Sequence, residues 1–199
     1  MHTIDKNRTA LLVMDFQNDI VDPKGLFGSQ GIADQIREKQ AIPNTARAIA
    51  AARRAGVSVI HVAVAYRRGH PEIVGDAVLF RAIKDGNALV EGSWGAAFHP
   101  DVAPAEGELV VTKRGVSALS GTDLDAILRA TGITSLVLTG IVTNFVVEGT
   151  TRDAVDRGYC VTILTDCCAT FSDEMHRLAL DVLSRLAHLS TADEFSQAL

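Results

Sequence analysis

Short apolar runs alternate with helical patterns along most of the chain, and this alternation limits the fold more than any other feature. Apolar runs at 9–14, 57–64, 108–112, 135–139, 160–165 and 187–191 predict six strands. Helical patterns at 43–55, 122–131, 144–156 and 172–184 lie between most of them. Strands that are apolar along their whole length are typical of parallel sheets that helices cover on both faces. The sequence therefore predicts an α/β fold, a three-layer doubly wound parallel sheet with helices on both faces.

The segment 65–107 departs from this alternation. It is rich in Gly, Pro and His, and it holds only one short helical pattern, at 77–84. A connection this long and irregular is usually functional in a compact domain. We expect it to cover a pocket.

Composition limits the class of protein. A chain of 199 residues that is 47% hydrophobic is long enough for one domain with a sizeable core, so we expect a single domain over 1–199. The net charge is −5 with both signs mixed, which argues against nucleic acid and membrane surfaces as partners. No signal peptide and no membrane-length apolar run are seen, and the three cysteines favour reduced thiols. We therefore expect a cytoplasmic protein.

Three strand ends carry residues suited to chemistry. The apolar run at 136–138 ends in Gly140 and turns at once into a helix-like segment, where the first amides of a helix can hold an anion or oxyanion. Asp15 follows the first strand, and Lys113 follows the third. The carboxyl ends of parallel strands open the ligand crevice of such sheets. A lysine there lowers the pKa of a nearby carboxyl while burial raises it, and the sequence leaves that balance open.

The same segments resemble a known family. Residues 139–159, TGIVTNFVVEGTTRDAVDRGY, resemble the nucleophile segment of the isochorismatase-like cysteine hydrolases. Residues 11–19, LLVMDFQND, look like that family's first strand with its catalytic aspartate, and 111–119, VTKRGVSAL, look like its catalytic lysine segment. The resemblance implies the α/β fold predicted above, a hydrolase acting on a small molecule, and Asp15 and Lys113 as catalytic residues.

One position departs from the family's pattern. Where most of these hydrolases carry the nucleophilic cysteine, six residues after Gly140, this chain has Val146. Valine has no nucleophilic atom, so a covalent intermediate cannot form at that position. The resemblance also implies a cis peptide between Ile141 and Val142. The backbone amides of Val142 and Val146 remain candidates for an oxyanion hole, because they do not depend on a thiol.

Further candidates for the substrate pocket are Gln17, Trp94, Phe98, Thr143 and Phe145. For Trp94 and Phe98 an equally good interpretation is that they anchor their loop to the core or to a neighbouring subunit. Cys167 and Cys168 follow the fifth strand and are interpreted as buried packing residues.

We expect no metal and no cofactor, because the Asp-x-His pair of the family's metal-binding amidases is absent. His61 lies inside a predicted strand and is interpreted as a core or interface residue. His70 and His99 are expected to shape or line the pocket, and His176 to lie on the surface.

Three functions stay open. The first is an isochorismatase-type hydrolase in which Asp15 acts as general acid on a vinyl ether. The second is an amide or imide hydrolase in which Asp15 activates water, and the third is a catalytically silent small-molecule-binding protein. The resemblance also implies a homo-oligomer, a dimer or tetramer, to which 178–186 offers a candidate contact.

Overall fold

Six parallel strands form the centre of the protein. The computed structural model describes residues 4–199. The strands are β1 (Thr9–Met14), β2 (Ser58–Val64), β3 (Leu109–Lys113), β4 (Ser135–Ile141), β5 (Cys160–Ala169) and β6 (His188–Ser190). Their order in the sheet is β3-β2-β1-β4-β5-β6, and every pair is parallel. This confirms the fold class that the apolar alternation predicts.

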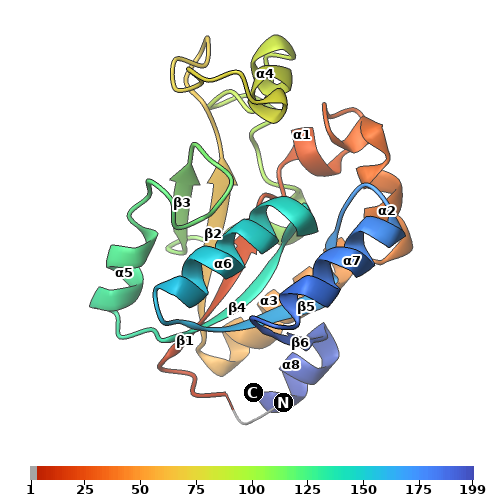
Figure 1. Ribbon diagram of the computed structural model, residues 1–199. Helices are drawn as coiled ribbons and strands as arrows, with labels where there is room; N and C mark the ends of the chain where they lie inside the picture. Colours follow the sequence, from red (N-terminus) through yellow and green to blue (C-terminus); the bar gives the residue numbers. More distant parts are fainter. Residues whose placement is uncertain (1–3) are drawn as a thin grey trace.

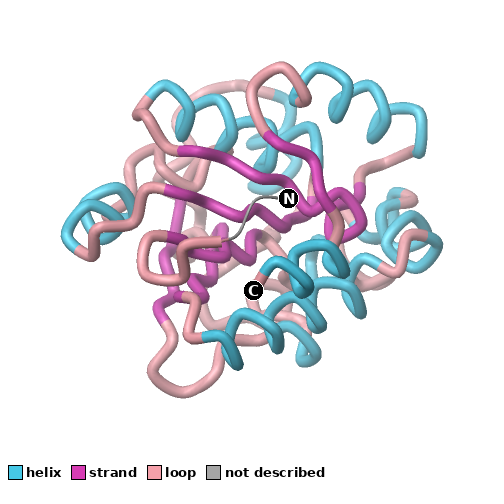
Figure 2. The backbone as a smooth tube through the Cα atoms, turned by 90° about the horizontal axis from the view of Figure 1, so that it is seen from below, coloured by secondary structure: helices cyan, strands magenta, loops and turns pink. Residues whose placement is uncertain are grey.

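Helices cover both faces of the sheet (Figures 1 and 2). Side chains from α2 (Ile32–Glu38), α3 (Ala41–Ala55) and α8 (Ala192–Ala198) share one core with Leu11 and Val13 of β1. Side chains from α5 (Leu124–Ala130), α6 (Glu148–Asp156) and α7 (Asp173–Leu183) share a second core with the alternate β1 residues. Since successive side chains of a strand point to opposite faces, an all-apolar β1 requires both layers.

The strand order fixes where the site lies. β1 pairs with β2 on one side and with β4 on the other, and the crossovers leave in opposite directions from this point. A crevice opens beyond the carboxyl ends of strands at such a switch point. Asp15 follows β1 there in a left-handed conformation, with φ 62°, and its amide donates to Val62 O at 2.9 Å. Aspartate tolerates this conformation better than most residues.

Some elements differ from the sequence prediction. The predicted helix at 144–156 begins with a wider π-type turn, Thr143–Val147, before α6. β5 continues to Ala169, so Cys167 and Cys168 lie inside the strand rather than after it. Two short helices, α1 (Asn18–Val21) and α2, and the C-terminal α8 have no counterpart in the prediction. Each has at most seven residues, too few for a clear periodic signal.

The expectation that His176 lies on the surface is wrong. α7 lies against the junction after β4, and His176 is on its inner face with 7% of its surface exposed. Its Nδ1 is 2.9 Å from the hydroxyl of Thr143. Burial lowers the pKa of His176 to about 4, so the ring is neutral at pH 7. The periodicity of α7 did not reveal this, because an acidic pair precedes the histidine and its partner is remote in sequence.

The outer face of α7 is partly apolar. Met175, Leu178 and Val182 are between 40% and 49% exposed. Their spacing forms one stripe along the helix. The homo-oligomer stays a prediction.

Across residues 4–199, no helix has the length and apolar character that crossing a membrane requires.

A half-buried carboxylate links the edge strand β3 to its neighbours. Glu108 accepts from Arg53 of α3 at 2.7 and 2.8 Å, and it lies 3.1 Å from the ring of His61 in β2. Hydrogen bonding from Arg53 is the main cause that lowers the pKa of Glu108 to about 2. His61 is fully buried, in agreement with its interpretation as a core residue.

Replacing this carboxylate is expected to cost stability in a pH-dependent way. The pKa of Glu108 falls from 4.5 to about 2 on folding, so its contribution is complete above about pH 4.5 and is lost as the pH falls toward 2. Glu108→Gln should lower the free energy of unfolding at pH 7 by about 2 kcal/mol, and by less at pH 4. Urea titration followed by circular dichroism measures both, with exposed Glu106→Gln as the control. An equal loss at the two pH values would contradict the assignment.

Candidate active site

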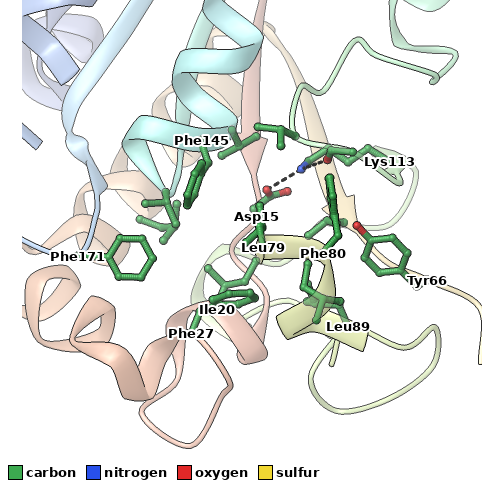
Figure 3. Close-up of a pocket in the computed structure, with 17 residues that line it drawn as sticks. Asp15, Ile20, Phe27, Tyr66, Leu79, Phe80, Leu89, Lys113, Phe145 and Phe171 are labelled. Carbon is green, nitrogen blue, oxygen red and sulfur yellow. Dashed lines mark hydrogen bonds and ion pairs between the residues drawn. The ribbon is translucent and has the colours of Figure 1, made fainter. Parts of the chain in front are cut away.

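A small cavity lies beyond the carboxyl ends of β1, β3 and β4 (Figure 3). The space open to the centre of a water molecule is about 50 Å³, which is room for roughly four waters. Its lining residues are Asp15, Ile20, Phe27, Val64, Tyr66, Leu79, Phe80, Ile83, Leu89, Lys113, Gly115, Val116, Ile141, Val142, Phe145, Val146 and Phe171. The segment 65–107 supplies several of them, which confirms that it covers a pocket.

A buried ion pair forms the polar centre of the cavity. Lys113 Nζ is 2.9 Å from Asp15 Oδ2 and donates to Gly115 O at 2.8 Å. Asp15 and Lys113 are only 5% and 2% exposed. The other carboxylate oxygen, Asp15 Oδ1, is buried and has no hydrogen-bond partner among residues 4–199. Because a buried acceptor without a partner is costly, this oxygen is available to a bound molecule.

The environment keeps the Asp15 carboxyl close to its point of titration. Burial raises the pKa of Asp15, and the charge and hydrogen bond of Lys113 lower it by less, so the pKa is about 6. The balance that the sequence leaves open is therefore decided in favour of burial. Near neutral pH, both the protonated and the ionised form are accessible, and the residue can act as an acid or as a base.

Apolar side chains form the rest of the wall. Phe145 and Phe171 meet edge to face on one side of Asp15, with ring centroids 6.3 Å apart, and Leu79 and Phe80 come from α4 (Val78–Asp85). Among the described lining residues, Tyr66 is the one other with a polar side chain, and its hydroxyl donates to Arg114 O at 3.1 Å. Burial raises the pKa of Tyr66 to about 12, so this hydroxyl stays protonated.

The junction after β4 places backbone beside the ion pair. The peptide between Ile141 and Val142 is cis, as the family resemblance implies, and Val142 and Val146 both line the cavity. A side chain at Gly140 would lie 3.1 Å from Met14 O and 3.2 Å from Val147 Cγ2. Glycine therefore allows the junction to approach β1 closely. The assignment of the Val142 and Val146 amides as an oxyanion hole stays a prediction.

Four of the expected pocket residues lie elsewhere. Among the lining residues of the described chain, Gln17, Trp94, Phe98 and Thr143 are absent, and only Phe145 of that group is present. Thr143 is bonded to His176, and Trp94 is 52% exposed. The ring of Phe98 packs edge-on against His61, with centroids 5.6 Å apart, so Phe98 anchors its loop.

Gln17 fastens the cover of the cavity instead of lining it. Its amide nitrogen donates to Val64 O and Ala96 O, and its oxygen accepts from Val64 N, all at 2.8 Å. The next two side chains act in the same way. Asn18 donates to Trp94 O at 2.8 Å, and Asp19 accepts from Leu89 N at 2.7 Å. The residues after Asp15 thus hold the segment 65–107 over the site.

The cysteines and the remaining histidines also lie outside the cavity wall. Cys167 and Cys168 are fully buried, and burial raises the pKa of the Cys168 thiol to about 12, so they match the packing interpretation. His70 is buried and bonded to Ala88 O at 2.7 Å, where it shapes the cover. His99 accepts from Asp101 N at a short turn and is not among the lining residues.

Comparison with known proteins identifies the family. The family described as the isochorismatase domain matches residues 9–194. The chain belongs to the isochorismatase family. It is 33% identical to an uncharacterized isochorismatase family protein, YwoC, of Bacillus subtilis, over 96% of this chain and 94% of that protein.

Two further proteins that resemble this member of the isochorismatase family carry names that point to hydrolysis. The ureidoacrylate amidohydrolase RutB of Methylobacterium radiotolerans is 34% identical over 89% of this chain and 73% of that protein. The crystal structure of an isochorismatase-like hydrolase from Alkaliphilus metalliredigens superposes with a TM-score of 0.79 at 33% identity, covering 96% and 98% of the two chains. These relatives support a hydrolase at the level of the family.

The fastening role of Gln17 has a measurable consequence. Gln17→Glu replaces the nitrogen that makes two N–H donations with one carboxylate oxygen that faces the carbonyls of Val64 and Ala96. The free energy of unfolding should fall by about 2–4 kcal/mol, because buried acceptors lose their donors. Urea titration measures this, with the exposed Gln197→Glu as the control. A loss no larger than that of the control would show that the side chain is not a structural link.

Proposed function

We propose that this protein is a small-molecule hydrolase in which the Asp15 carboxyl, oriented by Lys113, moves protons without a covalent intermediate at residue 146. The observation that carries the proposal is the unpaired Asp15 Oδ1 on the cavity wall, on a carboxyl with a pKa of about 6. No cysteine, serine or threonine is among the described residues that line this cavity. The segment that resembles the family's nucleophile segment has Val146 at the cysteine position.

One version of the chemistry uses the protonated form of Asp15. The carboxyl would donate its proton to the carbon of a vinyl ether, which gives an oxocarbenium-like species. Water would then add to this species as the Asp15 carboxylate takes up the proton that the water loses, and the resulting hemiketal would divide into an alcohol and a carbonyl compound. The raised pKa of Asp15 favours this version, because it keeps part of the carboxyl protonated near pH 6.

The second version uses the ionised form. Asp15 would take a proton from water, which attacks the carbonyl carbon of an amide, while the Val142 and Val146 amides would stabilise the oxyanion. The intermediate would collapse to an acid and an amine as Asp15 returns the proton to the leaving nitrogen. The similarity to the ureidoacrylate amidohydrolase favours this version.

The pH dependence of turnover separates the two versions. If protonated Asp15 is the acid, kcat/KM should fall as the pH rises through about 6; if ionised Asp15 is the base, it should fall as the pH drops through about 6. Pyruvate release from isochorismate tests the acid version, and ammonia release from a set of primary amides tests the base version. Asp15→Asn should lower either activity by about 100-fold or more.

A second variant ties that pH profile to Asp15. Lys113 lowers the pKa of Asp15, so Lys113→Met should move the inflection to higher pH. Far-UV circular dichroism and the unfolding midpoint establish that the variant is folded. A folded Lys113→Met protein with an unchanged inflection would contradict the assignment of the profile to Asp15, and full activity in Asp15→Asn would refute the proposal.

Turnover is also expected to leave the protein unmodified. Intact-mass spectrometry of reactions quenched in the steady state should show only the 21.2 kDa chain, because no cysteine, serine or threonine is among the described residues that line the cavity. Iodoacetamide should alkylate the exposed Cys160 without loss of activity, and Cys160→Ser should behave like the wild type. A substrate-derived adduct on Cys167 or Cys168 would overturn the non-covalent mechanism.

A further inference from the structure

The cation on the cavity wall is already neutralised. Lys113 is paired with Asp15 and also donates to Gly115 O, and it is the only basic residue among the described lining residues. Arg114, the next residue along the chain, does not line the cavity. Its guanidinium donates to Ala65 O and pairs with Glu91, and it lies 3.7 Å from Glu72. An anionic ligand would find no free positive charge here.

The unpaired oxygen of the site is an acceptor. An ionised Asp15 Oδ1 needs a donor, and a second carboxylate beside it would add a like charge in a buried space. A neutral amide N–H or hydroxyl would satisfy the same oxygen. The polar part of the site therefore favours an uncharged donor over an acid.

The apolar part of the cavity limits size and shape. Phe27, Phe80, Phe145 and Phe171 stand around it together with Leu79 and other aliphatic side chains. Space of about 50 Å³ fits an apolar group of a few carbon atoms. A molecule with two carboxylates would have to bury at least one of them against these walls, which is costly without a partner.

We propose that the site takes a small uncharged molecule whose apolar part of a few carbon atoms packs against the phenylalanines and whose single polar group, an amide, donates to Asp15 Oδ1. The inference rests on the proposed function for the identity of the reacting group. It makes an uncharged amide the substrate class and excludes dicarboxylates such as isochorismate.

A matched pair of probes tests the charge preference directly. Isobutyramide and isobutyrate have nearly the same shape and differ in charge. Calorimetric titration of the wild-type protein at pH 7.5 should show isobutyramide binding at least about 10-fold more tightly than isobutyrate. Equal or tighter binding of isobutyrate overturns the inference, and so does the failure of isobutyramide, acetamide and benzamide all to bind.

A gain-of-charge variant adds a second test. Leu79 lies on the partly exposed α4 and lines the cavity, so Leu79→Arg brings an unpaired cation to the wall. Binding of isobutyrate should strengthen by about 10-fold or more in Leu79→Arg and should not in Leu79→Gln, which is polar but uncharged. No gain with arginine, in a variant that unfolds at the wild-type midpoint, would show that charge does not set the preference.

Turnover is scored separately from binding. If uncharged amides bind and none of them releases ammonia, the base version of the proposed function fails while the charge preference stands. If isobutyrate or isochorismate binds more tightly than the amides, the charge preference fails, whether or not the protein hydrolyses anything.

Discussion

The desolvation of one carboxyl group is the constraint on which the site depends. Asp15 is placed at the switch point of the sheet by an all-buried strand, and the segment 65–107 closes over it. The charge and hydrogen bond of Lys113 lower the pKa of Asp15. They do not cancel the larger rise that burial causes, so the pKa is about 6. A buried ion pair of this kind adds little net stability. Reactivity explains this pair better than stability does, because apolar residues at both positions would avoid the cost of burying two charges.

Much of the fold was readable from the sequence because its signals are local. Near-continuous apolar runs gave the strands, and Gly56 and Gly132 end their helices in left-handed conformations that suit glycine. The three motif segments gave Asp15 and Lys113, which the structure brings to 2.9 Å. Their contact was predictable because both follow parallel strands, and parallel strands end at the same edge of the sheet.

The rest of the site could not be predicted from the sequence, because its residues carry no local signal. Leu79, Phe80 and Phe171 line the cavity from segments without a motif, and no periodic pattern distinguishes a pocket wall from a core contact. Gln17 was misassigned because a polar residue next to Asp15 serves equally well as a ligand contact or as a backbone partner. Only the positions of Val64 and Ala96 decide between the two. The position of His176 was predicted wrongly for the same reason, because its partner Thr143 is 33 residues away in the sequence.

Different residues hold the cover in place and shape the cavity. Gln17, Asn18 and Asp19 do the first. These side chains hold backbone groups of the cover, and none of them is among the described residues that contact the cavity. The wall residues of α4, in contrast, lie on a helix with one buried residue, Ile83. Substitutions in α4 can therefore alter which molecules fit without loosening the cover or moving Asp15. Such a division lets the shape of the pocket diverge among relatives while the acid–base pair and the sheet beneath it are kept.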